Sequence, residues 1–284
     1  MTGVLCSARP VWTIAAYTWR EGMRKKVLIG FLILSILVLF GAQFLTSFLT
    51  VPVAMGEQQP EDVDVQTKLI KDICITVISI FGALITIFIS ASVVPGEIEN
   101  KVIYTVLSKP VRRFQYLLGK FLGVQLIILI NLALMAGLFF VALWVKEGVT
   151  PTLLLWAIFL LYFQLLIVSA FTFAVSCAAT SAVVPTILGL FIYVTGNMTD
   201  YLKDTARRAG QTDLKFDEII GWIADGLFQV LPNLKYFSLR SQLVLLRPDD
   251  PPQGVLFSNL IVYALVFTLA GYLIAYWVFR RREM

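Results

Sequence analysis

The side chains best suited to chemistry or to partner binding lie in one short charged stretch, residues 95–120. It begins with Pro95 and Gly96, and the carboxylates Glu97 and Glu99 follow directly. Proline suits the first turn of a helix, and carboxylates near a helix N-terminus are stabilised by the helix dipole. We therefore expect an apolar span to be interrupted at Pro95 and a short helix to follow, with Glu97 paired to Lys101 at i, i+4 spacing.

This short helix would have an apolar face and a polar face. Ile98, Val102 and Val106 recur at helical spacing and can pack toward the membrane, which leaves the polar side chains for a partner. The alternative is a solvated hairpin at the membrane surface. The residues predicted to couple the chain to a partner are Glu97, Glu99, Lys101, Tyr104, Ser108, Lys109, Arg112 and Arg113.

Several kinds of chemistry lack the residues they need. The chain has no histidine and no GxxxxGK[ST] phosphate loop, so we expect no ATP hydrolysis by this chain. Its three cysteines, Cys6, Cys74 and Cys177, lack the spacing of a zinc site. An intramembrane protease would need a His, Lys or carboxylate cluster in the membrane. We therefore predict no catalytic, cofactor-binding or metal-binding residue and no enzyme activity.

The elements that position the charged stretch are long and apolar. Hydrophobic residues make up 58% of the sequence and charged residues 14%, which is typical of an integral membrane protein. A membrane-spanning helix needs about 20 apolar residues, and the chain has several continuous apolar segments of about this length. We therefore expect an all-α membrane protein with one domain over residues 1–284. Six transmembrane helices are predicted near 27–49, 73–94, 117–145, 152–177, 182–199 and 255–279.

Basic residues set the predicted orientation. They are in excess before the first span, in the 95–120 stretch and in the C-terminal tail, which a six-span chain places on one side. Because cytoplasmic loops retain Lys and Arg, both termini should be cytoplasmic in a prokaryotic plasma (inner) membrane. The basic character then reflects topology and membrane lipids, and no basic-aromatic platform for nucleic acid is visible. The spans carry no charge in their central parts, with Lys120 near an end, so energy should come from outside the chain.

Two amphipathic segments lie outside the spans, one before the first span and one between the fifth and the sixth. Residues 8–26 are predicted to form an interfacial helix, with Trp12 and Trp19 on one stripe; the alternative is a simple cytoplasmic extension. Residues 199–254 form an external segment, whose helix near 216–230 would rest on the membrane. The external lid residues are Ile220, Ile223 and Leu227. Residues 50–72 are expected to be a solvated external connection.

Small and polar residues recur at helical spacing in two spans. Such stripes either allow close helix packing or line a polar path. The second span carries Ser79, Gly82, Thr86 and Ser90, and the fourth carries Ser169, Thr172 and Ser176. Both alternatives stay open at this point.

The order of these features resembles the permease subunits of ABC-2-type transporters. The resemblance rests on the acidic start of the charged stretch, the Leu107-Ser108-Lys109-Pro110 run, the basic pair that follows it and Leu118-Gly119-Lys120. Leu231-Pro232-Asn233 before the last span resembles the NosY-like branch. The resemblance implies a type V exporter-like bundle with a cytoplasmic coupling helix within residues 95–116.

The resemblance also implies partners. Two permease chains, as a homodimer or heterodimer, would pair with two cytosolic ABC ATPase subunits, which hold the ATP and Mg. The chain would form the substrate path of an exporter, and the uncharged spans favour an amphipathic or lipid-like substrate. The alternative function is a non-transporting membrane scaffold or anchor for a cytosolic complex.

Overall fold

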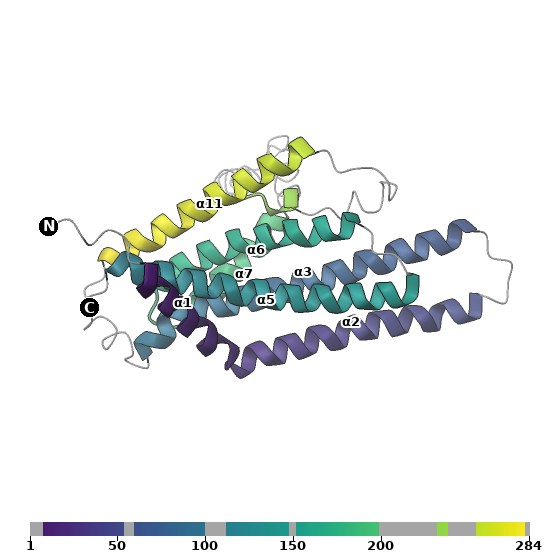
Figure 1. Cartoon of the computed structure of the whole chain (residues 1–284), viewed down its shortest axis with the longest axis horizontal. Coiled ribbons are helices and arrows are strands. Elements are labelled where there is room, and N and C mark those ends of the chain that lie inside the picture. Colours follow the sequence, from purple (N-terminus) through teal and green to yellow (C-terminus); the bar gives the residue numbers. More distant parts are fainter. Residues whose placement is uncertain are drawn as a thin grey trace, which may run out of the picture.

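The chain forms a bundle of long helices (Figure 1). The computed structural model describes residues 8–53, 60–99, 112–147, 152–198, 232–237 and 254–281. Within these ranges no strand occurs, and the predicted all-α architecture is confirmed. The helices are α1 (Ala8–Met23), α2 (Lys26–Val53), α3 (Pro60–Glu99), α5 (Arg113–Glu147), α6 (Thr152–Ala178), α7 (Val183–Asn197), the 3-10 helix η1 (Leu234–Phe237) and α11 (Gly254–Arg281).

Helix α6 lies at the centre of the bundle. It contacts α3, α5, α7, α11 and η1, and Leu160, Leu165 and Phe173 are fully buried along it. In Figure 1, α6 lies between α11 and α3. A helix that is apolar on every side can be buried all round, which explains why α6 takes this place.

Four helices are long and apolar enough to cross a membrane. They cover Lys71–Glu99, Arg113–Val145, Leu154–Ala178 and Ser258–Arg281 of the described residues. Shorter apolar helices cover Ile29–Gly41 and Val183–Asn197, at the positions of the predicted first and fifth spans. At 1.5 Å per residue the 15 residues of α7 reach only about 22 Å, short of the roughly 30 Å hydrocarbon core. A count of six crossings therefore stays a prediction.

Helix α3 is longer than the sequence predicted at both ends. It begins at Pro60, so Pro60–Asp72, expected to be a loop, is helical, and its solvation stays a prediction. It also runs through Pro95 to Glu99, so the predicted interruption at Pro95 is wrong. A proline removes one backbone donor, and neighbouring helices make this tolerable inside a membrane bundle. The side chains of Pro95 and Glu97 consequently lie on buried positions of a continuous helix.

Helix α1 packs closely on the first half of α5. The helix predicted over residues 8–26 is confirmed over Ala8–Met23, with Ala15 and Thr18 buried and Trp12 exposed. A Cβ atom at Gly119 would lie 2.8 Å from the Val11 carbonyl oxygen, and one at Gly123 would lie 2.8 Å from the Ala15 carbonyl oxygen. Glycines spaced by four residues therefore let the two backbones meet. Location in the membrane interface stays a prediction for α1.

Residues 232–237, in the 199–254 segment, are partly buried against the helices. Leu234 and Phe237 of η1 are buried, and Leu234 occupies the space where a side chain at Gly196 would otherwise lie. The Lys235 N–H donates to Asn233 Oδ1 at 3.1 Å, and the Asn233 N–H donates to Tyr263 Oη at 3.0 Å. Asn233 thus joins η1 to α11. Ile220, Ile223 and Leu227 lie outside the described residues.

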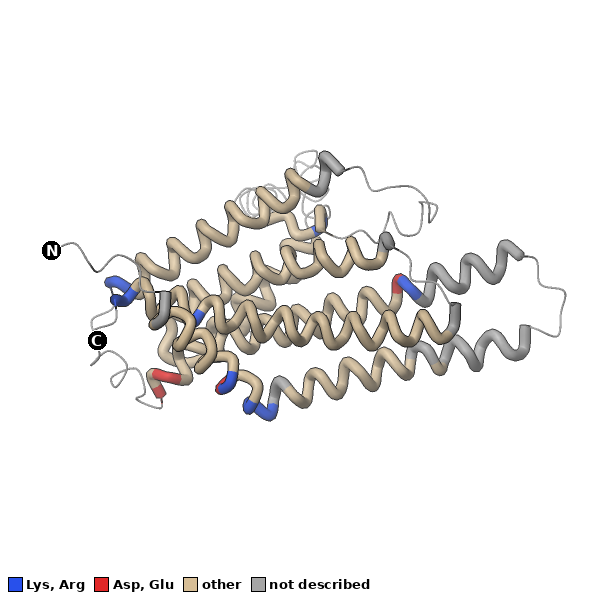
Figure 2. The backbone as a smooth tube through the Cα atoms, in the orientation of Figure 1, with Lys and Arg blue, Asp and Glu red and all other residues tan. Residues whose placement is uncertain are grey.

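Charged residues gather at one end of the bundle, which we call the polar end. The turn between α1 and α2, the end of α3, the start of α5 and the end of α11 meet there (Figure 2). Arg113 Nη1 of α5 donates to the Arg280 carbonyl oxygen of α11 at 3.2 Å. The three basic segments of the sequence therefore share one side of the bundle, as the topology predicted.

The α1–α5 contact can be tested with two glycines of the same helix. Gly123→Ala should lower stability by roughly 1–3 kcal/mol, because the added methyl group meets Thr18 and the Ala15 carbonyl oxygen. Gly137→Ala is the matched control, since nothing lies within 4 Å of a Cβ atom there. It should be neutral or stabilising. Thermal unfolding of both variants in detergent decides the matter, and equal effects would contradict the close contact.

Candidate functional site

A buried ion pair at the polar end joins α3 to α5. Glu97 and Lys120 are each 2% exposed. Lys120 Nζ donates to one carboxylate oxygen of Glu97, and Tyr116 Oη donates to the other. Both carboxylate oxygens are thus satisfied. A charge removed from water costs several kcal/mol unless it is paired and hydrogen-bonded, so these three groups depend on one another.

The three groups meet because they occupy buried helix faces. Glu97 follows Ser90, Val93 and Val94 at spacings of seven, four and three residues, and all three are buried in α3. In α5, Tyr116 and Lys120 are four residues apart and therefore share one face. Continuation of α3 past Pro95 carries Glu97 onto this face, opposite the first turns of α5.

Helix α1 reaches the same ammonium group. Glu21 Oε2 lies 3.9 Å from Lys120 Nζ, and the Tyr17 ring centroid lies 5.5 Å from it. Glu21 is 37% exposed, so its attraction to Lys120 is weaker than that of the enclosed Glu97. Lys120 therefore contacts side chains from α1 and α3 as well as Tyr116 of its own helix.

Lys25, in the turn between α1 and α2, adds a second cation. Its Nζ donates to Ser92 Oγ of α3 at 2.9 Å. Burial lowers the pKa of Lys25 below its ordinary value; nearby Glu21 and Glu97 raise this pKa and nearby Lys120 lowers it. The start of α2 is thereby tied to α3, one turn before Glu97.

The polar cluster is tightly packed around Lys120 and leaves no room there for a substrate. We define it as Glu21, Lys25, Ser92, Glu97, Tyr116 and Lys120. The cavity beside it is bordered by Glu21, Lys25 and Lys120 and has a volume of about 10 Å³. This is roughly the space that one water needs. Positioning of helices is the chemistry that the enclosed groups Glu97, Tyr116 and Lys120 can do.

Aromatic rings enclose the cluster on the side of α11. Tyr116 stacks on Phe279 with ring centroids 5.8 Å apart, and Tyr272 Oη donates to the Phe114 carbonyl oxygen at 3.3 Å. Phe121 packs between Phe173 of α6 and Tyr272. These rings keep water from the buried ion pair, which strengthens its electrostatic attraction.

The structure corrects the predicted exposure of Glu97. The sequence predicted that Glu97 faces a partner and pairs with Lys101, whereas the carboxylate is buried and bound by Tyr116 and Lys120. Glu99, Arg112 and Arg113 are exposed at the polar end, as expected for a docking surface. Lys101, Tyr104, Ser108 and Lys109 lie outside the described residues.

The sequence prediction missed four members of the polar cluster. They are Glu21, Lys25, Ser92 and Tyr116. One signal could have found Tyr116: it lies four residues before Lys120 in an apolar helix, where a lysine needs a polar neighbour. No sequence signal pairs Lys25 with Ser92, because that contact depends on the turn between α1 and α2.

The small polar stripes are placed where helices pack. Thr86 donates to the Gly82 carbonyl oxygen at 2.7 Å and Thr172 to that of Val168 at 2.8 Å, so these hydroxyls are satisfied within their own helices. Ser169 and Ser176 are likewise buried and bonded to α6 carbonyl groups. Ser79 Oγ lies 3.1 Å from Tyr193 Oη of α7. Ser90 Oγ is buried and has no hydrogen-bond partner within the described part of the chain. This arrangement supports the packing alternative.

The fold and the charge distribution define a multi-pass helical membrane protein. The family model for the ABC-2 family transporter protein matches residues 12–284, and the chain belongs to this family. The match runs from α1 to the C-terminus and so includes the whole polar cluster. A comparison with curated proteins gave no match. Over the residues that the structure describes, no group of three or more His, Cys, Asp or Glu side chains is placed to hold a metal ion.

Loss of one member of the ion pair should be worse than loss of both. Lys120→Met leaves the Glu97 carboxylate buried with only Tyr116 and should lower stability by about 3–5 kcal/mol. The double variant Glu97→Gln, Lys120→Met removes both charges and should recover most of this loss. Thermal unfolding in detergent measures both. Additive losses in the double variant would show that the two charges do not depend on each other.

Proposed function

We propose that this chain is the permease subunit of an ATP-binding-cassette exporter, with the motor in a separate cytosolic ATPase. The family match over residues 12–284 carries the proposal, since membership of this family implies association with an ABC ATPase. Two permease chains, identical or different, would pair with two ATPase chains. ATP and Mg would bind in the ATPase, and the helices of this chain would form the substrate path without catalysis of their own.

The charge distribution supports a cytoplasmic polar end. Lys25 and Lys26 lie at the start of α2, Arg112 and Arg113 at the start of α5, and Arg280 and Arg281 at the end of α11, all at this end of the bundle. By the positive-inside rule this end would face the cytoplasm of a prokaryotic inner membrane. Both termini and the 95–116 segment would then be on the ATPase side, as six crossings require.

The polar cluster holds together the two helices that the proposed coupling segment connects. Residues 100–111 connect Glu99 to Arg112, and the chain is fixed on both sides of this connection by the bonds of Glu97 to Tyr116 and Lys120. A rigid movement of the ATPase against the segment would therefore displace α3 and α5 together. Lys120 would pass this movement to α1 through Glu21. Exposed Glu99, Arg112 and Arg113 would contact the ATPase, together with Lys101, Tyr104, Ser108 and Lys109.

The remaining details of the proposal follow from the resemblance. In a type V exporter-like bundle of the NosY-like branch, the Leu-Pro-Asn motif would precede the last span. The described residues at this position contact both α7 and α11. An amphipathic or lipid-like substrate fits spans without central charges. Ile220, Ile223 and Leu227 would anchor an external lid at the outer leaflet.

The first test is copurification. The tagged full chain, expressed with the ATPase encoded beside it and solubilised in mild detergent, should retain that ATPase on a column. Nucleotide hydrolysis in the eluate should depend on the ATPase Walker lysine and not on this chain. If the chain shows a cooperative thermal unfolding transition, and is therefore folded, but never retains an ATPase, the permease assignment is contradicted and the scaffold is favoured.

The second test separates docking from positioning. Glu99→Lys reverses an exposed charge and should weaken ATPase retention by roughly two- to fivefold, as expected of a surface pair worth about 1 kcal/mol or less, without loss of thermal stability. Glu97→Lys places a second cation beside Lys120 and should lower the unfolding temperature in the chain alone. If Glu97→Lys kept full stability, the buried position of this carboxylate would be wrong.

A further inference from the structure

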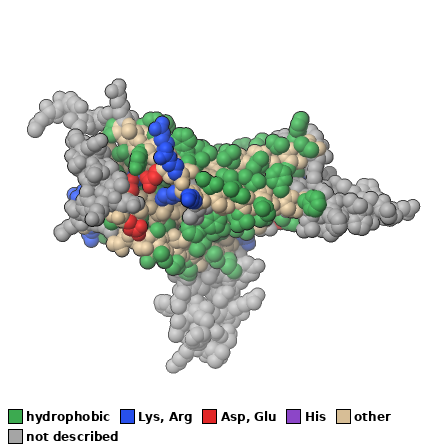
Figure 3. All heavy atoms as spheres, turned by 90° about the horizontal axis from the view of Figure 1, so that it is seen from below, with side chains coloured by type: hydrophobic (Ala, Val, Ile, Leu, Met, Phe, Trp, Pro, Cys, Tyr) green, Lys and Arg blue, Asp and Glu red, His purple; other side chains and the backbone are tan. Residues whose placement is uncertain are grey.

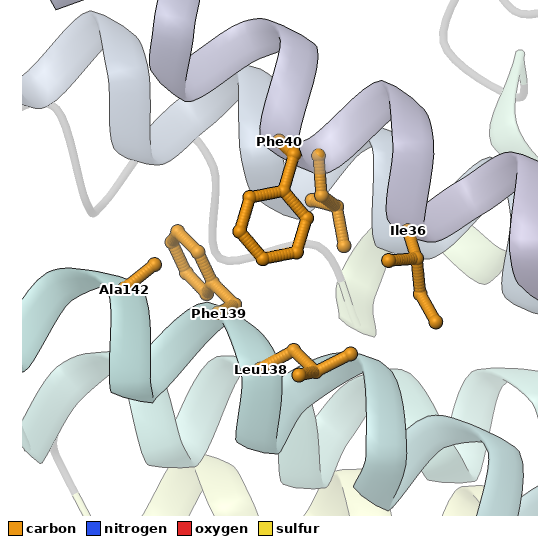
Figure 4. A pocket seen from close by; sticks show the side chains of 6 residues that line it. Ile36, Phe40, Leu138, Phe139 and Ala142 are labelled. Carbon is orange, nitrogen blue, oxygen red and sulfur yellow. The ribbon is translucent and has the colours of Figure 1, made fainter.

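A cleft between helices lies between the start of α2 and α3. It has a volume of about 320 Å³ and is lined by Lys25, Lys26, Phe31, Ile85, Phe88, Ile89 and Ser92. We call it the α2–α3 cleft. Its volume is at the lower end of the range of small-molecule sites. A second hollow, between α2 and α5, is shown in Figure 4; it is wholly apolar, with a volume of only about 10 Å³, and Phe40 and Phe139 fill it from the two helices.

The α2–α3 cleft has a basic end and an apolar body. Lys25 and Lys26 supply two ammonium groups at the polar end, immediately before the apolar Ile29–Gly41 stretch of α2. Phe31 stacks on Phe88 with ring centroids 5.1 Å apart, and Ile85 and Ile89 complete the apolar wall. Both rings are half-buried, so the wall is reachable from the surface. Figure 3 shows blue side chains beside red ones at one end of a broad hydrophobic face.

The carboxylates of the described segments do not balance the charges at the basic end. Glu21 and Glu97 face the two cations Lys25 and Lys120. Lys26 is exposed, and no carboxylate of the described segments lies within ion-pair distance of it. The pKa of Lys25 is lowered by burial, so an added anion would stabilise its ammonium form. The cleft therefore presents an excess of positive charge directly above an apolar surface.

We propose that the α2–α3 cleft binds one anionic phospholipid, with its phosphate at Lys25 and Lys26 and an acyl chain against Phe31 and Phe88. A soluble anion would leave the apolar wall uncovered, and a zwitterionic lipid brings a cation with its phosphate and so would not offset the excess positive charge. An anionic lipid satisfies both ends at once. The lipid would come from the leaflet that borders the polar end. The site is separate from the proposed docking surface and does not rest on the permease function.

Lys26 and Arg24 offer a matched test. Both are exposed cations in the same turn, but only Lys26 lines the cleft. The full chain in detergent is titrated with phosphatidylglycerol and with phosphatidylcholine of identical chains, and native mass spectrometry counts bound lipid. Phosphatidylglycerol should bind more tightly, and Lys26→Gln should weaken it about fivefold, the equivalent of roughly 1 kcal/mol for one basic residue near the headgroups. Arg24→Gln should change it less than twofold.

Two further arms test the lipid assignment. Phe31→Ala should weaken binding of both lipids, whereas Phe44→Ala, at an exposed position of the same helix, should not. Soluble glycerol phosphate should fail to displace the lipid at millimolar concentration. Equal loss in the Arg24 and Lys26 variants, equal affinity for the two lipids, or displacement by glycerol phosphate would each overturn the proposal.

Discussion

The polar end of this protein depends on one constraint: a charge that leaves water must find a partner of opposite charge. Glu97 and Lys120 are both enclosed, and each is tolerable only while the other is in place. The pair fixes the last turn of α3 against the second turn of α5. Tyr116 and the rings of α11 then exclude water from it. A buried pair of this kind acts less as a source of stability than as a selector of one helix arrangement.

Close backbone contact acts beside this pair. In a membrane, lipid tails are as apolar as the side chains, so helices associate through packing rather than through the hydrophobic effect. Gly119 and Gly123 let the α1 backbone approach α5, and Gly189 lets α7 approach α3 and α6 near Ile87 and Thr172. Helices α1, α3 and α5 are thus held by two independent means, one ionic and one steric. A force on the connection between α3 and α5 would therefore displace these three helices together.

Helix α2 is held differently from this unit. Its start is tied to α3 by Lys25 and Ser92, and Phe31 stacks on Phe88 of α3, but the α2–α3 cleft leaves part of this interface open. A bound lipid there would lie between the fixed helices and α2. This lipid would complete the packing interface between α2 and α3 at the polar end.

The sequence by itself determined the class and the order of the elements. Long apolar segments can only be helices in a membrane, because every backbone group needs a partner within its own segment, and all six predicted positions are helical. The resemblance to ABC-2-type permeases carried by the charged stretch agrees with the family match, while the NosY-like branch stays a prediction. Helix ends were less predictable: Pro95 usually ends a helix in water, whereas packing against neighbours carries α3 on to Glu99.

Tertiary structure alone decided which charges are buried. Glu97 and Glu99 are two residues apart and chemically alike, yet one is enclosed by α5 and the other is exposed. Their local sequence gives both the same helix-dipole stabilisation, so nothing local separates them. The difference arises from the face that each presents to a helix more than 15 residues further along the chain. Periodicity places residues on faces of a helix. Only the packing of α1, α3 and α5 shows which face is buried and which ammonium group pairs with the buried carboxylate.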